Sequence, residues 1–186
     1  MASFILQLLC ILLVALLIYC GCLALYNRRT GARMTARQVF IGLFVAYTVA
    51  IILLALQPRF TSDLPASAQT AAARLRSGAN INLIPFRSIA QFASGGIDTA
   101  FLINIVGNVL LFVPLGFCLP FFWPRWRRFT KMLLVGAGFS FTIEFIQLFI
   151  NRSVDIDDLI LNTAGVLLGY AVCMLACALQ AKKTGA

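Results

Sequence analysis

One segment of this chain, residues 143–169, combines acids, amides and a single arginine with long runs of apolar residues. Its candidate functional side chains are Glu144, Gln147, Arg152, Asp155, Asp157, Asp158 and Asn162. Carboxylates can act as general acids or bases, whereas amides and arginine bind sugar hydroxyls, peptide groups and phosphates. A charge among apolar residues costs free energy, so we expect these side chains to serve a function.

The composition of the whole chain is that of a membrane protein. Of its 186 residues, 61% are hydrophobic and only 11% are charged, and the mean hydropathy is +0.95. A water-soluble domain of this size needs a more polar surface, and a helix crosses a bilayer with about 20 apolar residues. The sequence therefore predicts an all-α fold, a polytopic transmembrane helix bundle with five spans near residues 2–26, 38–57, 101–123, 132–150 and 159–181.

The distribution of cations predicts how the chain crosses the membrane. Lys and Arg residues near the ends of spans are retained on the cytoplasmic side. The segments after the first, third and fifth spans hold ten Lys and Arg residues and no acid, whereas cations and acids cancel in the other two connections. We therefore predict an N-terminus outside and a C-terminus in the cytoplasm. The net charge of +9 follows from this topology, so nucleic acid is not an expected partner.

The predicted spans divide the chain into segments. Residues 1–57 form two N-terminal transmembrane helices joined by a basic cytoplasmic loop. Residues 58–100 form an extracytoplasmic loop with an interfacial segment, and this loop is too short for a separate domain. Residues 173–186 contain the end of the last helix and a cytoplasmic tail. The chemistry is therefore expected in the part between residue 80 and the last helix.

The long extracytoplasmic loop carries two local signals. An Ala-rich stretch predicts a short helix through Ser67 to Arg76, which Gly78 would end. The segment 80–86 is apolar but too short to span the membrane, and Pro85 interrupts it. We therefore expect this segment to lie at the interface or to insert partway, with its polar groups buried against protein or facing a water-filled cavity.

Polar side chains from three predicted helices lie at similar depths. At 1.5 Å per residue, Asn108 and Glu144 lie about 9 to 10 Å from the outer ends of their helices. Asn104, Gln147 and Asn162 lie about 5 Å deep. Spacings of three or four residues place the polar side chains of each helix on one face. These positions predict one polar pocket that opens to the outside of the membrane.

Two glycines of the last helix support this convergence. Gly165 and Gly169 continue the face of Asn162, and their Gly-xxx-Gly spacing allows a neighbouring helix to approach closely. That face must pack against protein, which brings Asn162 toward the third and fourth helices. The loop before the last helix then holds Arg152 and three aspartates over the opening.

The same residues also allow a structural interpretation. The amides could only tie helices together, and Arg152 could form a solvated cluster with the aspartates. Asp155 and Asp157 could hold a divalent cation, but a third ligand is not assured, so no metal and no cofactor are predicted. The six cysteines fit small apolar core residues, and the chain has no histidine.

Several short motifs occur together between residues 80 and 172. They are Asn82-Leu-Ile-Pro-Phe86, Asn104-x-x-x-Asn108 with Pro114 and Gly116, Glu144-x-x-Gln147, Arg152-x-x-Asp155-x-Asp157-Asp158, and Asn162-x-x-Gly165 with Gly169. In this combination the chain resembles the VanZ-like family of bacterial membrane proteins. The name member of that family raises tolerance of teicoplanin, a lipid-tailed glycopeptide. The resemblance implies a VanZ-like core at residues 80–172 and a multi-pass protein of the bacterial cytoplasmic membrane.

The resemblance and the predicted pocket together favour a ligand-binding function at the outer leaflet. Expected partners are membrane lipids and a lipid-linked cell-wall precursor or a lipoglycopeptide, with apolar helix faces accepting the lipid tail. The oligomeric state does not follow from the sequence. The candidate ligand-binding residues are Asn82, Asn104, Asn108, Glu144, Gln147, Arg152, Asp155, Asp157, Asp158 and Asn162.

Other functions stay open at this point. An intramembrane enzyme acting on an envelope lipid or glycan could use Glu144 as general acid or base and Asp155 or Asp157 as its partner. Against it, the sequence has no Gly-x-Ser-x-Gly nucleophile motif and no histidine. A lipid transporter would need a pocket open to both sides, and five spans leave little room for inverted repeats. A purely structural or assembly role is the remaining alternative.

Overall fold

The computed structural model describes residues 2–31, 35–55, 68–94, 99–149 and 152–184. Five helices in this part of the chain are long and apolar enough to cross a membrane, which confirms the predicted helical fold and the number of spans. They are α1 (Ala2–Thr30), α2 (Ala36–Ala55), α5 (Thr99–Phe122), α6 (Phe129–Phe149) and α7 (Ile156–Thr184). Each end lies within four residues of the predicted span.

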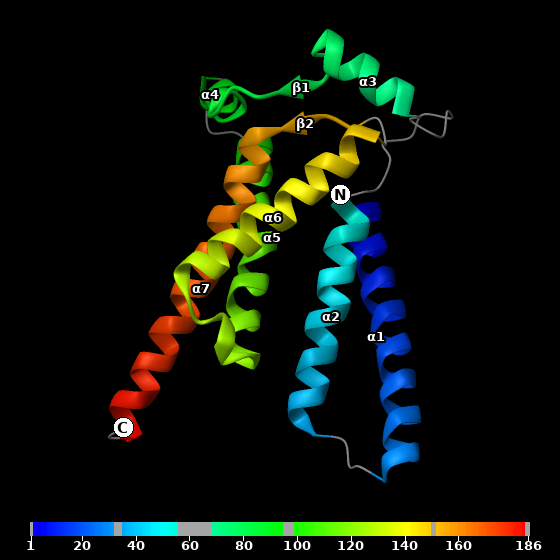
Figure 1. Cartoon of the computed structure of the whole chain (residues 1–186), viewed down its shortest axis with the longest axis vertical. Coiled ribbons are helices and arrows are strands. Elements are labelled where there is room, and N and C mark those ends of the chain that lie inside the picture. The colour runs from blue at the N-terminus through cyan, green and yellow to red at the C-terminus, as the bar shows by residue number, and fades with distance from the viewer. Residues whose placement is uncertain (1, 32–34, 56–67, 95–98, 150–151, 185–186) are drawn as a thin grey trace. The chain divides into compact units, whose positions relative to one another are not determined.

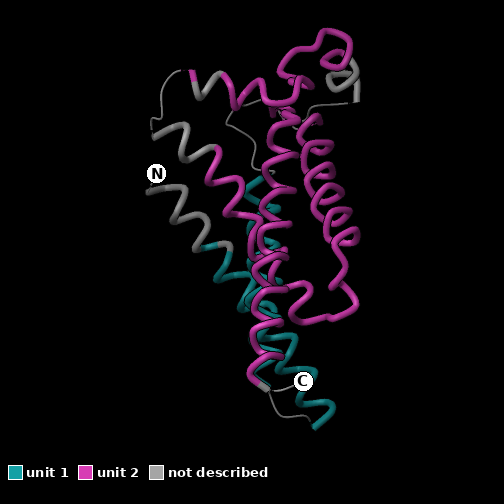
Figure 2. The backbone as a smooth tube through the Cα atoms, turned by 90° about the vertical axis from the view of Figure 1, so that its left-hand side faces the viewer, with its two compact units in different colours: residues 1–57 teal, residues 58–186 magenta. Residues whose placement is uncertain are grey.

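The chain forms two compact units, residues 1–57 and 58–186 (Figure 2). In the first unit, α1 and α2 pack against each other. The ring of Tyr19 lies against Gly42, where an added Cβ atom would stand 2.3 Å from ring atoms. The Tyr19 hydroxyl also donates a hydrogen bond of 2.8 Å to the backbone carbonyl of Gln38. A glycine thus permits the close approach of an aromatic side chain between the two helices.

The second unit is built on α5 and α7, which lie side by side (Figure 1). Gly165 and Gly169 of α7 face α5, as their spacing predicts. A Cβ atom at Gly165 would stand 2.2 Å from the carbonyl oxygen of Val109, and one at Gly169 would stand 2.0 Å from that of Val113. Any larger side chain would therefore push the two backbones apart. Helix α6 packs against α7 as well, and Met132 and Val166 are fully buried.

One end of the second unit carries a group of short elements, which we call the capping layer (Figure 1). It consists of α3 (Ala68–Ser77), β1 (Ile81–Asn82), α4 (Arg87–Ser94) and β2 (Val154–Asp155). Strand β1 pairs with β2 in parallel, with Ile81 opposite Val154 and Asn82 opposite Asp155. The predicted short helix is confirmed as α3, although Ser67 lies outside the described residues. The strand pair was not predicted, and it adds a small element to the helical fold.

Residues with positive φ shape the turns of the capping layer. Gly78, with φ of +68°, ends α3 as predicted, and Asn80 follows with φ of +56°. Phe86 has φ of +64° directly before α4. Asparagine tolerates this left-handed region better than most residues do, whereas a bulky phenylalanine adopts it only where surrounding contacts hold it. The contacts that hold Phe86 belong to the site described below.

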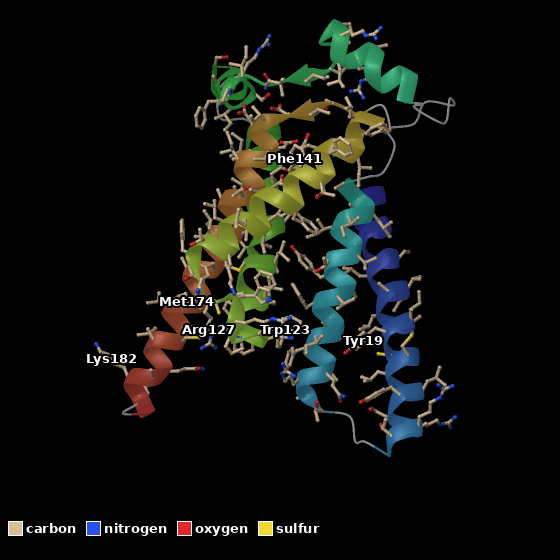
Figure 3. The ribbon with its side chains drawn as sticks, viewed as in Figure 1. Tyr19, Trp123, Arg127, Phe141, Met174 and Lys182 are labelled. Carbon is tan, nitrogen blue, oxygen red and sulfur yellow. The ribbon has the colours of Figure 1, made fainter. Side chains whose placement is uncertain are left out.

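The opposite end of the second unit is basic and aromatic. Trp123 and Arg127 lie in the connection between α5 and α6, which contains the short 3-10 helix Pro124–Trp126, and Lys182 lies near the end of α7 (Figure 3). The capping layer and the first turn of α7, by contrast, hold three arginines and three aspartates, so their charges cancel. This separation agrees with the charge pattern from which the orientation was predicted, but the orientation itself stays a prediction.

Candidate functional site

Glu144 lies on α6, one to two turns before that helix ends, and is only 5% exposed. Its Oε2 atom accepts a hydrogen bond of 2.9 Å from the backbone N–H of Asp155. The guanidinium of Arg152 interacts electrostatically with Glu144 and with Asp158. The carboxylate therefore ties α6 to the strand β2 and the start of α7, and its charge is partly balanced by a cation from the same loop.

The carboxylate of Asp155 accepts hydrogen bonds from three neighbours at the junction of β2 and α7. Its Oδ1 atom accepts a hydrogen bond of 2.9 Å from the backbone N–H of Asp157, which is the contact that an N-cap residue makes with the first turn of a helix. The same oxygen accepts from the Asn82 side chain at 2.9 Å. Its other oxygen accepts from the hydroxyl of Ser88. One carboxylate thus holds β1, α4 and α7 together.

Asp157 is 1% exposed and lies against the start of α4. Its two oxygens accept backbone N–H groups from Phe86, from Ser88 at 2.8 Å and from Ile89 at 3.2 Å. A helix N-terminus presents such unpaired donors and a positive dipole end, so a carboxylate is stabilised there. This arrangement also explains the positive φ of Phe86, because the turn aims its N–H at Asp157. In the described part of the chain, no group of three or more His, Cys, Asp or Glu side chains is placed to hold a metal ion.

The remaining predicted residues form separate pairs between helices. Asn108 of α5 donates a hydrogen bond of 2.6 Å to Asp158 of α7. Asn162 of α7 donates one of 3.0 Å to the hydroxyl of Ser140 on α6. Gln147 is buried, and the side chain of Asn104 lies outside the described residues. These residues therefore link α5, α6 and α7 in pairs, and whether any of them binds a ligand stays a prediction.

Arg74 is a buried residue that the sequence reasoning missed. This side chain of α3 is 6% exposed and donates hydrogen bonds to backbone carbonyls at the end of α6 and in the following loop. Its Nη1 atom lies 2.7 Å from the carbonyl oxygen of Leu148 and 3.5 Å from that of Gln147, and its Nη2 atom bonds the carbonyl of Arg152. The last carbonyls of a helix lack partners within the helix. Arg74 supplies these partners and thereby fixes α3 over the end of α6.

A cavity of about 240 Å³ lies beneath the strand pair. Its apolar walls come from α3, the segment after β1, α6 and α7, and include Leu75, Leu83, Phe141, Phe145, Leu148 and Leu159. Four of these side chains are more than half exposed, namely Leu75, Leu83, Phe141 and Phe145, so the cavity is open along that side. Phe141 lies on α6 below the strand pair (Figure 3). Glu144 and Asp155 contribute to the wall from behind, with their carboxylates held by the contacts described above.

A second hollow of about 390 Å³ lies among β1, β2 and the start of α4, and its lining is polar. The polar residues along it are Asn80, Asn82, Arg87, Ser88, Ser153 and Asp155. Ile81, Val154 and Asp155 line both this hollow and the apolar cavity. The strand pair is therefore a partition with an apolar space on one side and a polar space on the other. Of the predicted ligand-binding residues, Asn82, Glu144 and Asp155 line one or both spaces.

The sequence model of the VanZ/LLP1 family matches residues 43–177, which is most of the chain. The matched region includes α5, α6, the capping layer and α7 as far as residue 177. No curated protein and no solved structure matches this chain.

Proposed function

The chain belongs to the VanZ/LLP1 family, and from this we propose that it is a multi-pass membrane protein that binds the apolar tail of a lipid-linked or lipid-tailed ligand. The observation that carries the proposal is the cavity beneath the strand pair. Ligand sites are concave and mostly apolar, with a few polar groups at fixed positions. This cavity has almost entirely apolar walls, as an acyl chain requires, and the carboxylates of Glu144 and Asp155 in its lining are held by hydrogen bonds within the fold.

We place the capping layer on the outer side of the bacterial cytoplasmic membrane. The basic end of the second unit then faces the cytoplasm, as expected for Lys and Arg residues near the ends of spans. In this orientation the cavity lies at the level of the outer leaflet. Lipid-linked cell-wall precursors and lipid-tailed glycopeptides such as teicoplanin present their tails at that level. Retention of such a molecule is how the protein would contribute to glycopeptide tolerance.

The contacts of the acids favour binding over catalysis. Glu144 and Asp155, the candidate catalytic pair, are both acceptors of hydrogen bonds from groups that hold the fold together. A general acid or base must reach the reacting atoms of a substrate, whereas these carboxylates face backbone N–H groups and amides. No comparable observation supports the transporter alternative. A transporter needs a pocket open to both sides of the membrane, whereas the apolar cavity and the polar hollow both lie at the capped end of the second unit.

A cavity-filling substitution tests the proposal. Leu159→Trp places a large ring in the cavity, whereas Leu175→Trp makes the same exchange on α7 at a site that is 62% exposed and away from the cavity. Each variant and the wild type are expressed at matched membrane levels, verified by immunoblot, in a glycopeptide-sensitive Gram-positive host. We expect wild type and Leu175→Trp to raise the inhibitory concentration of teicoplanin more than that of vancomycin, which has no lipid tail, and Leu159→Trp to lose this effect.

The same assay separates the alternatives. If Leu159→Trp protects as well as wild type, the cavity does not bind the relevant ligand. If wild type behaves like empty vector, the protein does not contribute to tolerance of teicoplanin. Glu144→Gln adds a test of catalysis, because Gln keeps an acceptor for the Asp155 N–H but cannot exchange a proton. If Glu144→Gln gives no protection but binds lipid as tightly as wild type does, the enzyme alternative is favoured.

A further inference from the structure

The polar hollow beside the strand pair carries a second, distinct set of groups. It is larger than the apolar cavity, at about 390 Å³ against about 240 Å³, and shares with it only the residues of the partition. We propose that this hollow binds the headgroup of an anionic phospholipid, through a phosphate and neighbouring hydroxyl groups. The inference rests on the proposed function, because the tail of the same lipid would occupy the apolar cavity.

The charges along the hollow favour an anion. Among the lining residues that the structure describes, Arg87 is the one cation, and it is exposed at the first position of α4. The one acid is Asp155, whose carboxylate already accepts three hydrogen bonds from Asn82, Ser88 and Asp157. These bonds occupy most of its acceptor capacity with fixed donors. An incoming group therefore meets an available guanidinium, which binds phosphate with charge-assisted hydrogen bonds.

The uncharged groups along the hollow favour hydroxyls next to that phosphate. Asn80 and Ser153 are both exposed, and they lie directly before β1 and β2. The backbone carbonyl of Asn80 accepts a hydrogen bond of 3.0 Å from the Val154 N–H, so the turn that carries this side chain is fixed. Amides and hydroxyls can each donate and accept, which suits glycerol or sugar hydroxyls. A choline group offers these side chains neither a donor nor an acceptor, and an ethanolamine ammonium offers donors only.

The surroundings of the hollow favour a lipid over a soluble phosphate. Leu83, Ile84 and Phe86 follow β1 directly and are 67%, 59% and 60% exposed. Large apolar side chains exposed together in a segment outside the spanning helices are suited to contact with acyl chains at the membrane interface. Leu83 also lines the apolar cavity. A lipid could therefore place its headgroup on one side of Ile81 and Val154 and its tail on the other.

The test measures which headgroup the purified full-length chain prefers. Native mass spectrometry in detergent compares phosphatidylglycerol, phosphatidylethanolamine and phosphatidylcholine with identical acyl chains. We expect wild type to bind phosphatidylglycerol about tenfold more tightly than phosphatidylcholine. All three lipids offer a phosphate to Arg87, but only the glycerol headgroup offers hydroxyls to Asn80 and Ser153, and a choline cation would stand beside the guanidinium. Arg87→Gln should therefore weaken the binding of all three lipids and reduce this preference. Arg76→Gln, which removes an exposed arginine outside the hollow, should retain it.

Several outcomes would overturn the inference. They are equal binding of phosphatidylglycerol and phosphatidylcholine by wild type, tightest binding of phosphatidylethanolamine, and an unchanged preference in Arg87→Gln. Binding of free glycerol 1-phosphate as tightly as phosphatidylglycerol would overturn the lipid assignment. Leu159→Trp separates this inference from the proposed function. If Leu159→Trp weakens the binding of all three lipids while wild type shows no headgroup preference, only the headgroup site is wrong. If Leu159→Trp changes the binding of none of them, the tail cavity is contradicted.

Discussion

The interface between α5 and α7 and the capping layer hold the second unit together by opposite means. Between α5 and α7 the contacts are made by glycines that face backbone carbonyls, at Gly165 and Gly169 of one helix and Gly116 of the other. In the capping layer the contacts are hydrogen bonds to buried or half-buried charged groups, namely Arg74, Asp155 and Asp157. The first interface depends mainly on the absence of side chains, with the hydrogen bond from Asn108 to Asp158 at its capped end, and the second depends on side-chain donors and acceptors.

This difference reflects how regular each region is. Regular helices satisfy their own backbone groups, so two of them can pack closely without polar partners. Short elements such as α3, α4 and the strand pair leave many N–H and carbonyl groups without partners at their ends. Side-chain carboxylates and a guanidinium supply those partners. Polar residues near the end of the bundle therefore stabilise the fold. They also frame the space in which we propose that a ligand binds.

The largest expected effect comes from adding one methyl group between α5 and α7. In Gly169→Ala the new Cβ atom would stand 2.0 Å from the Val113 carbonyl oxygen and 2.8 Å from the Phe117 nitrogen. Because both neighbours are backbone atoms, the helices must separate, and we expect a loss of about 3 kcal/mol or more in the free energy of unfolding. Reversible unfolding in mixed micelles measures this loss.

Gly138→Ala is the matched control for that experiment. This glycine lies on α6, and nothing stands within 4 Å of a Cβ atom added there. Alanine also favours the helical conformation over glycine. We therefore expect Gly138→Ala to unfold at the same denaturant concentration as wild type or slightly above it. Equal stability of Gly138→Ala and Gly169→Ala would show that the glycine contact does not set the distance between α5 and α7.

The two regions also differ in how far the sequence predicts them. The Gly165 and Gly169 spacing predicts a packed face, and the apolar runs predict all five spans, because a helix repeats its faces at short intervals. The strand pair has no such local signal. Each strand is two residues long, and Asn82 meets Asp155 only because α3 and α4 fold over the ends of α6 and α7.

The polar residues show the same limit. Depth and spacing correctly bring amides and acids to one end of the bundle, but they do not identify the partner of each side chain. Asp157 looks like a free loop acid in the sequence, whereas the structure buries it against the start of α4. Arg74 likewise looks like an exposed cation of the extracytoplasmic loop in the sequence, whereas the structure buries it. Its burial depends on where α3 lies, and α3 is placed by contacts with residues more than 70 positions away.

A smaller and more local effect is expected in the capping layer. Arg74→Lys keeps the charge, but a single ammonium cannot reach both the Leu148 and the Arg152 carbonyl groups that the two guanidinium nitrogens bond. We expect a cost of about 2 kcal/mol, confined to α3. Hydrogen exchange followed by mass spectrometry should show faster exchange in residues 68–77 and no change in α5 or α7. Arg76→Lys, an exposed neighbour on the same helix, should leave exchange unchanged. Faster exchange throughout the second unit would contradict the view that the capping layer and the helix interface are stabilised separately.

The smallest effect is expected where the two kinds of packing meet, at the hydrogen bond between Asn162 and Ser140. Its distance is 3.0 Å, both side chains are buried, and Oδ1 of Asn162 has no partner in the described part of the chain. Because Ser140→Ala leaves the amide N–H groups unpaired, it should cost about 0.6 kcal/mol, the average for such bonds between membrane helices. Asn162→Leu also removes the unpaired oxygen, so it should be nearly neutral, and Ser140→Ala should then cost nothing further in the Asn162→Leu background. If Ser140→Ala lowers the free energy of unfolding equally in both backgrounds, the hydrogen bond between Asn162 and Ser140 contributes nothing to stability. Close packing would then extend up to the capping layer without help from polar contacts.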